Sequence, residues 1–130
     1  MILKNLEEKM TALDYSVRML RIAAAAADEQ KASDIIAIDV SDALGITDAF
    51  LLASATSARH MNAIAEEIEK QLALQGNAKP REREGVGDES WILLDYGDFV
   101  IHVMTEESRE FYALEGLWKD CPIIDLGMNG

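Results

Sequence analysis

Cysteine, proline and long apolar runs are scarce in this sequence of 130 residues, and each absence narrows the possible functions. A single cysteine, Cys121, cannot form a framework of disulfide bonds. A zinc site needs three or four ligands, whereas the chain offers this thiol and two isolated histidines. No apolar run approaches the length of a membrane span, and the opening segment, with Glu7 and Glu8, lacks the apolar core of a signal peptide. The sequence therefore predicts a cytoplasmic protein that contacts no membrane and holds no metal or other cofactor.

Basic residues are also few: twelve lysines and arginines face twenty-four acidic residues, for a net charge of −12. Nucleic-acid binding relies on clustered Lys and Arg side chains that neutralise phosphates, so direct, sequence-specific nucleic-acid binding is disfavoured. Residues 88–125 contain ten acidic and two basic residues, a net charge of −8. A field of that sign would steer the protein toward a basic protein surface, although the same charge could simply keep a small protein in solution.

The sequence motifs of catalysis are missing. No phosphate-binding loop is present, since Gly85 and Gly87 lie in an acidic segment, and no serine has the context of a nucleophile elbow. Carboxylates at the ends of predicted strands could chelate Mg²⁺, but nothing basic or glycine-rich near them would hold a nucleotide. Such aspartates more often form turns and caps. We therefore predict that the protein is not an enzyme; the alternative is a divergent nucleotidyltransferase that uses Asp39, Asp48 or the pair Asp95 and Asp98.

The first half of the chain alternates helix and strand patterns. Apolar residues spaced by three and four predict a helix over residues 1–30, which would pack on the domain's own sheet or, as an a/d stripe, on a second copy. Two nearly continuous apolar runs, residues 35–40 and 49–55, are typical of central strands. Hydroxyl side chains after the second run would cap a helix over residues 58–75.

The second half of the chain predicts a loop, a hairpin and a last helix. Residues 77–89 are polar and contain a proline and two glycines, which indicates a loop. Strands over residues 91–94 and 99–104 would be joined by a turn at Asp95–Asp98, and a helix from Glu106 to about Trp118 would follow. The whole pattern predicts a single α/β (α+β) domain with a mixed β-sheet and helices packed on its faces.

The faces of the hairpin can be assigned by parity, because side chains alternate between the two faces of a strand. A loop with an even number of residues would place Leu94 opposite Phe99 and Ile92 opposite Ile101. A loop of four is favoured over a loop of two, because a two-residue type I′ turn would force Tyr96 to a positive φ. One face is then entirely apolar and is predicted to face the core: Ile92, Leu94, Phe99, Ile101 and Val103.

The opposite face of the hairpin combines an indole, an imidazole, a thioether and aliphatic side chains. It is too apolar for free solvent and too polar for a core, and apolar patches with charged rims mark interaction sites. A helix from either end of the chain could instead cover this face, and the sequence leaves both possibilities open. Its residues are Trp91, Leu93, Val100, His102 and Met104, with Asp95 and Asp98 at the tip.

Five short segments carry a resemblance to a known family. In order and spacing, the chain resembles the Iojap-like ribosomal silencing factors from about Ala23 to Lys119. Each segment alone is weakly specific, and five in register are strongly specific. One departure is the family's turn G-T-S-S-R, which appears here as Ala55-Thr56-Ser57-Ala58-Arg59 and loses backbone freedom but keeps a cap. The segments are Ile46-Thr47-Asp48, Thr56–His60, Trp91–Asp98, Ile101–Met104 and Glu107–Glu115.

The resemblance implies both a fold and a role. The fold is similar to a nucleotidyltransferase core without its catalytic site, with residues 1–22 as an N-terminal helical extension, 23–119 as the core and 120–130 as a tail. The role is binding to the large ribosomal subunit, through ribosomal protein fourteen of that subunit, on the intersubunit face. There the factor sterically blocks association with the small subunit and represses translation.

The resemblance also implies where the partner binds. In the family, the partner surface is formed largely by the strands around the stretch W-x-x-x-D-x-G-D, and an acidic rim around an indole suits a basic ribosomal protein. A further alternative is a homo-oligomeric scaffold, or a homodimer off the ribosome, joined through Leu6, Met10 and Leu13. The predicted partner-binding residues are Trp91, Leu93, Asp95, Tyr96, Gly97, Asp98, Val100, His102 and Met104.

Overall fold

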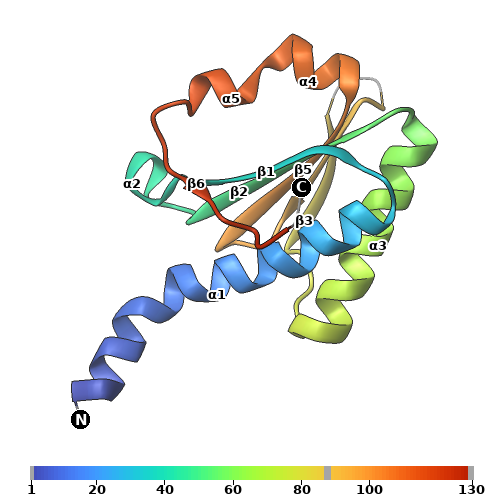
Figure 1. Cartoon of the computed structure of the whole chain (residues 1–130). Coiled ribbons are helices and arrows are strands. Elements are labelled where there is room, and N and C mark those ends of the chain that lie inside the picture. The colour runs from blue at the N-terminus through green and yellow to red at the C-terminus, as the bar shows by residue number, and fades with distance from the viewer. Residues whose placement is uncertain (1, 87–88, 129–130) are drawn as a thin grey trace.

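A six-stranded mixed sheet forms the centre of the protein in this computed structural model, which describes residues 2–86 and 89–128 (Figure 1). Its strands are β1 (Ser33–Asp39), β2 (Ala49–Ala55), β3 (Glu82–Val86), β4 (Trp91–Asp95), β5 (Phe99–Thr105) and β6 (Ile123–Ile124). They lie in the order β3-β4-β5-β2-β1-β6. The neighbours β2 and β5 are parallel, and the other neighbouring pairs are antiparallel, which confirms the predicted mixed sheet.

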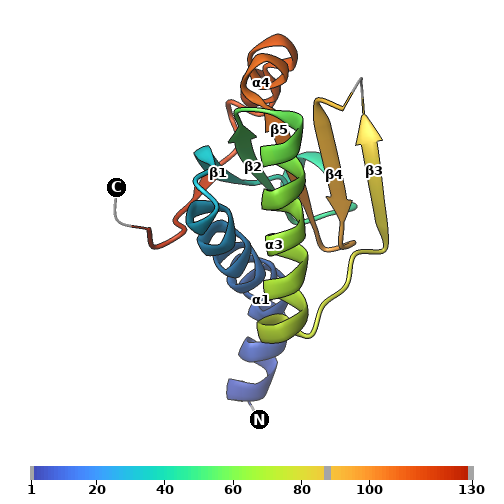
Figure 2. The same cartoon turned by 90° about the vertical axis from the view of Figure 1, so that its right-hand side faces the viewer.

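Helices lie on both faces of this sheet, as the sequence predicts. The described residues form α1 (Ile2–Glu29), α2 (Ser41–Leu44), α3 (Ala58–Gly76), α4 (Glu106–Tyr112) and α5 (Leu114–Leu117). The long helices α1 and α3 pack against each other and cover one face, while α4 and α5 lie over the other (Figures 1 and 2). Within the described ranges, no helix has the length and apolar character needed to span a membrane.

The main core lies between the two long helices and the sheet. Small side chains of α1, including Ala23, Ala24 and Ala27, are fully buried and allow this helix to approach the sheet closely. In α3 the buried residues recur at the predicted three- and four-residue spacing: Met61, Ile64, Ala65, Ile68 and Leu72. The apolar stripe predicted for the first helix is buried in the second half of α1. The side chains of Leu6 and Met10 lie outside the described part of the structure.

The hairpin has the predicted faces and a different register. All five residues of the predicted apolar face belong to the main core. However, Leu94 pairs with Ile101 rather than with Phe99, so the predicted pairing is wrong by two residues. The reason is that the turn closes between Tyr96 and Phe99, where the Tyr96 N–H donates to the Phe99 carbonyl at 3.0 Å. Gly97 takes the positive φ of 86°, so Tyr96 does not need to. A shift of two residues preserves both faces.

Part of the predicted loop over residues 77–89 is a strand, so that prediction is wrong for residues 82–86. The segment pairs with β4 in antiparallel register from Glu82–Asp95 to Val86–Trp91. A strand at the edge of a sheet uses backbone hydrogen bonds on one side only and needs no buried side chains. Its exposed charged residues therefore concealed it from a search for apolar patterns.

The predicted last helix is interrupted, and a short helix before β2 was missed. The helix that was expected to reach Trp118 ends at Tyr112, because Ala113 adopts a left-handed conformation with φ of 46°. After this break, Leu114 and Trp118 pack against the second apolar cluster, on the far face of the sheet. The missed helix, α2, is a single turn that follows a local hydrogen bond from the Ser41 N–H to the Asp39 carboxylate at 3.0 Å.

The core assignment predicts a large difference between two Ile→Ala substitutions. Ile101 is fully buried in β5, so Ile101→Ala should lower the free energy of unfolding by about 2–5 kcal/mol. Ile123 is 71% exposed in β6, and Ile123→Ala should change it by less than about 0.5 kcal/mol. Urea denaturation of both variants measures the difference, and equal losses would contradict this account of the core.

Candidate functional site

The face of the sheet opposite α1 and α3 is divided into a covered and an open part. At one end, α4 lies over the sheet: Tyr112 contacts Trp91 with ring centroids 4.9 Å apart, and Met104 is fully buried. Beyond α5, Trp118 packs edge-on against Phe50 at 5.7 Å. The covering helix that the sequence left as an alternative is therefore present, but it shields only part of this face.

The uncovered part of this face contains a cleft of about 420 Å³. Its floor is built by three neighbouring strands, because the register pairs Leu93 of β4 with His102 of β5, and Val100 of β5 with Phe50 of β2. On one side stand α2 and the loop that follows it, and on the other side stands β3. The cleft is lined by Leu44, Ile46, Thr47, Phe50, Arg81, Glu82, Glu84, Leu93, Asp95, Gly97, Val100 and His102.

The rim of the cleft is acidic. Glu82, Glu84 and Asp95 contribute three carboxylates, and Arg81 contributes one guanidinium. The hairpin turn is held in place at this rim, since the Gly97 N–H donates to the Asp95 carboxylate at 2.8 Å and the Arg81 N–H donates to the Asp95 carbonyl at 2.6 Å. An apolar floor within an acidic rim is suited to a partner that combines apolar and basic groups.

His102 is the central polar group of the cleft floor. Only 5% of the residue is exposed, and its ring packs edge-on against Phe50 with centroids 4.8 Å apart. The Trp91 indole N–H lies 3.1 Å from Nδ1 of His102. Because an indole nitrogen can only donate, Nδ1 must accept, and in the neutral ring the proton is on Nε2. No hydrogen-bond partner for Nε2 is found in the part of the chain that the structure describes.

Burial keeps this imidazole neutral. Desolvation, the larger cause, and the positive charge of Arg109 together lower the pKa of His102 from 6.5 to about 4. Arg109 is itself buried, donates to Ser54 Oγ at 2.9 Å and lies 3.0 Å from a carboxylate oxygen of Glu115. Burial alone would raise the pKa of Glu115, but the hydrogen bond and the charge from Arg109 outweigh it, and the net pKa is lowered. The cleft floor is therefore uncharged at neutral pH.

The structure brings five of the nine predicted site residues together at this cleft: Leu93, Asp95, Gly97, Val100 and His102. Trp91 lies beside them, half-buried under Tyr112, and Met104 is too deeply buried to touch a partner. Tyr96 is on the opposite face of the sheet, stacked on Phe99 with centroids 4.8 Å apart. Asp98 lies in the exposed hairpin turn.

Several residues of the cleft were not among the predicted site residues. Leu44, Ile46, Thr47 and Phe50 come from α2, the next loop and β2, and Arg81 precedes β3. One signal was present in the sequence: Ile46 is an isoleucine within a polar turn, and 86% of it is exposed. Thr47, its neighbour, is buried although it also belongs to this turn.

The four candidate catalytic aspartates all lie at one end of the sheet, and the carboxylates of three of them accept hydrogen bonds from the protein itself. The carboxylate of Asp39 accepts from the backbone and hydroxyl of Ser41, that of Asp95 accepts from the turn, and that of Asp48 accepts from the Ser16 hydroxyl at 3.2 Å. Over the described ranges, 2–86 and 89–128, no three Asp, Glu, His or Cys residues are arranged to hold a metal ion. Asp39 and Asp95 therefore stabilise local turns and Asp48 connects β2 to α1, and nothing in this geometry supports the transferase alternative.

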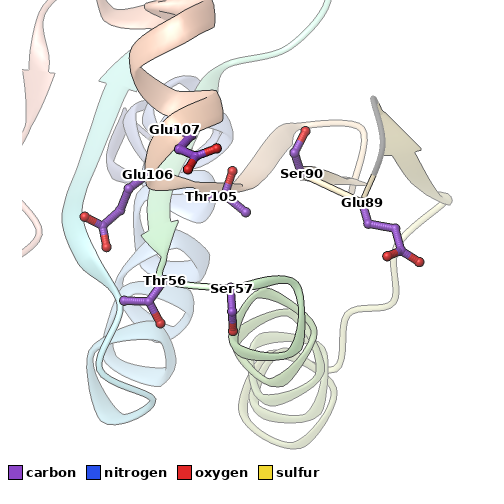
Figure 3. A pocket seen from close by; sticks show the side chains of 7 residues that line it. All are labelled: Thr56, Ser57, Glu89, Ser90, Thr105, Glu106 and Glu107. Carbon is purple, nitrogen blue, oxygen red and sulfur yellow. The ribbon is translucent and has the colours of Figure 1, made fainter.

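A second cavity of about 510 Å³ lies where α3 and α4 begin (Figure 3). The hydroxyls of Ser57 and Thr105 already accept hydrogen bonds as helix caps, from the N–H groups of His60 and Ser108. Glutamates account for the charge in the lining, which consists of Thr56, Ser57, Glu89, Ser90, Thr105, Glu106 and Glu107. Their carboxylates oppose the approach of a phosphate, so this cavity is a poor nucleotide site.

A small α/β domain with an apolar cleft and an acidic rim has the surface features of a protein-binding module. Comparison with known proteins then identifies the family. Residues 13–129 match the family described as "Ribosomal silencing factor during starvation". The chain therefore belongs to the ribosomal silencing factors, a regulatory family, which confirms the resemblance inferred from the sequence.

Individual relatives agree with this assignment. The chain is 41% identical over 113 residues to the ribosomal silencing factor of Bacillus subtilis, covering 85% of this chain and 95% of the relative. It is 35% identical over 108 residues to a mouse protein named "Mitochondrial assembly of ribosomal large subunit protein 1", covering 82% of this chain and 44% of the relative. Among solved structures, a protein of Chromobacterium violaceum superposes with a TM-score of 0.73 at 29% identity, covering 78% of this chain and 84% of that one.

The lowered pKa of His102 predicts a pH-dependent stability. Between pH 6.5 and about 4 the unfolded chain binds a proton at this residue that the folded chain excludes. The free energy of unfolding should therefore decrease as the pH falls through this window, by up to about 3 kcal/mol from this residue. Urea denaturation from about pH 7 to pH 4.5 should show a steeper loss for the wild type than for His102→Asn, and parallel losses would contradict the assignment.

Proposed function

We propose that this protein binds the large ribosomal subunit through ribosomal protein fourteen, on the intersubunit face, and sterically blocks association with the small subunit. Translation is repressed as a result. Membership of the silencing-factor family supports the general role. The printed name of the mouse relative, which refers to assembly of the large ribosomal subunit, supports that subunit as the partner.

The acidic, apolar cleft is the observation that carries this proposal. Ribosomal proteins are basic because they neutralise the phosphates of ribosomal RNA. An acidic protein with a net charge of −12 attracts such a surface at long range, and the apolar floor supplies the buried contact. A steric block needs only occupancy of the site, so the mechanism uses no catalytic residue.

The test is sedimentation with isolated large subunits, with and without added small subunits. The wild-type protein should sediment with large subunits and should reduce the amount of joined ribosomes in proportion to its own bound fraction. Binding to large subunits with undiminished joining would contradict the steric mechanism, and failure to bind would contradict the choice of partner.

Trp91→Ala should strongly weaken binding to large subunits. The substitution removes the indole that fills the space beneath Tyr112 and donates to His102, so the cleft floor loses its support. Trp91 lies beside the cleft and supports its floor, so we expect the dissociation constant to rise by about thirty- to a thousandfold, as on loss of an interface anchor. Leu74→Ala, at a residue of α3 that is 70% exposed on the other side of the sheet, is the control and should bind normally. Circular dichroism checks folding; a folded Trp91→Ala protein that binds like the wild type would refute this site.

Asp98→Asn should weaken binding in a salt-dependent way. The carboxylate is exposed in the hairpin turn and acts on a basic partner through long-range attraction. We expect an effect of about two- to fivefold at low salt, mainly on the association rate, that disappears at high salt. Asp28→Asn removes the same charge from an exposed position at the end of α1, and it should have a smaller effect at every salt concentration.

A further inference from the structure

Two buried polar groups at the cleft lack a hydrogen-bond partner in the described part of the chain. They are Nε2 of His102 and Oγ1 of Thr47, in residues that are 5% and 8% exposed. Most buried polar groups in folded proteins are paired, because desolvation of an unpaired group is costly. Both residues line the same cleft although they are far apart in sequence. Both atoms are closed to solvent in the free protein, so a partner would supply the missing hydrogen bonds by displacing the side chains that cover them.

The chemistry of these groups defines what such a partner must present. Because Nδ1 of His102 accepts from Trp91, its Nε2–H is a donor only and requires an acceptor. The hydroxyl of Thr47 can donate or accept. The remaining floor is formed by Phe50, Leu93 and Val100, which offer apolar contact alone. A protein backbone with an aliphatic side chain satisfies all three requirements, because its carbonyl and N–H groups alternate along the chain.

We propose that the cleft receives a segment of the protein partner, which places a main-chain carbonyl on Nε2–H of His102 and an aliphatic side chain between Phe50, Leu93 and Val100. The Thr47 hydroxyl forms the second hydrogen bond to the same segment. This inference rests on the proposed function and specifies how the partner is recognised: the two groups that are unpaired in the free protein become paired in the complex.

A protein segment fits this cleft better than a small molecule does. Ile46 lines the cleft and is 86% exposed, so the apolar surface of the cleft continues onto the outside of the protein. The carboxylates of Glu82, Glu84 and Asp95 surround the mouth, where they can meet basic side chains that flank the inserted segment. Apolar surface that continues beyond a cleft and ends in a charged rim is typical of a protein interface.

Thr47→Val tests the inference without altering the shape of the cleft. Valine has the same branched outline, so the free protein loses only a desolvated hydroxyl and should be at least as stable as the wild type. Binding to isolated large ribosomal subunits should nevertheless weaken by about five- to a hundredfold. Thr56→Val is the matched control, because Thr56 lies beyond the other end of β2, and it should bind like the wild type.

Two substitutions of His102 separate its two nitrogens. In His102→Asn, the side-chain carbonyl can still accept from Trp91, but no group reaches the position of Nε2. In His102→Gln, the amide N–H₂ reaches the position of Nε2, and the acceptor for Trp91 is lost. If Nε2–H donates to the partner, His102→Asn should bind large subunits about five- to a hundredfold more weakly than the wild type, and His102→Gln should bind more tightly than His102→Asn.

The outcomes distinguish this inference from the proposed function. If the wild type fails to sediment with large subunits, the proposed function is wrong. If the wild type binds and Trp91→Ala does not, while folded Thr47→Val and His102→Asn both bind like the wild type, the proposed function stands and the inference fails. Weakened binding by a Thr47→Val protein of undiminished stability, with Thr56→Val unchanged, supports the inference even if the His102 variants do not fold.

Discussion

The parallel pairing of β2 with β5 is the constraint on which the rest of this domain depends. All seven residues of β2 are buried, and the register places Phe50 beside Val100, so the strands of the core also set the floor of the cleft. The same pairing aligns the ends of both strands. At one end the Asp48 N–H donates to the Asp98 carbonyl at 2.7 Å, and at the other end α3 and α4 begin near each other (Figure 3). The positions of the cleft and of the hairpin turn thus follow from one ladder of hydrogen bonds.

The two faces of this sheet have different energetic roles. The face toward α1 and α3 is apolar throughout and supplies most of the hydrophobic stabilisation. The other face contains a neutral histidine, a buried arginine that is ion-paired with Glu115, and a threonine hydroxyl. Nε2 of the histidine and the hydroxyl have no hydrogen-bond partner in the described part of the chain. Unpaired polar groups lower stability, and natural proteins commonly retain such costs at functional sites. In the proposed function, stability and recognition therefore depend on opposite sides of the same strands.

The features that were predictable from the sequence are those that depend on local periodicity. The alternation of side chains along a strand assigned Leu93 and Val100 to one face and the core residues to the other. This assignment is the same for the predicted and the observed register. The register itself could not be predicted, because it depends on Gly97 rather than Tyr96 taking the positive φ. The strand β3 was missed because an edge strand needs no apolar pattern. The cleft was found only in part, because the opposite wall, with Thr47, is brought to the hairpin by tertiary strand pairing.

The charged edge strand β3 restricts how this surface can change. Its side chains Glu82, Arg83 and Glu84 are exposed, and Arg83 forms an ion pair with Glu69 of α3 at 3.1 Å. Charged side chains on a sheet edge hinder its pairing with the edge of another molecule, which is a common route to aggregation. Neutral, β-forming residues in place of the two glutamates would suit a less basic partner. The same change would allow the edge of β3 to pair with the edge of another molecule. Solubility therefore limits the range of partners that this wall of the cleft can acquire by mutation.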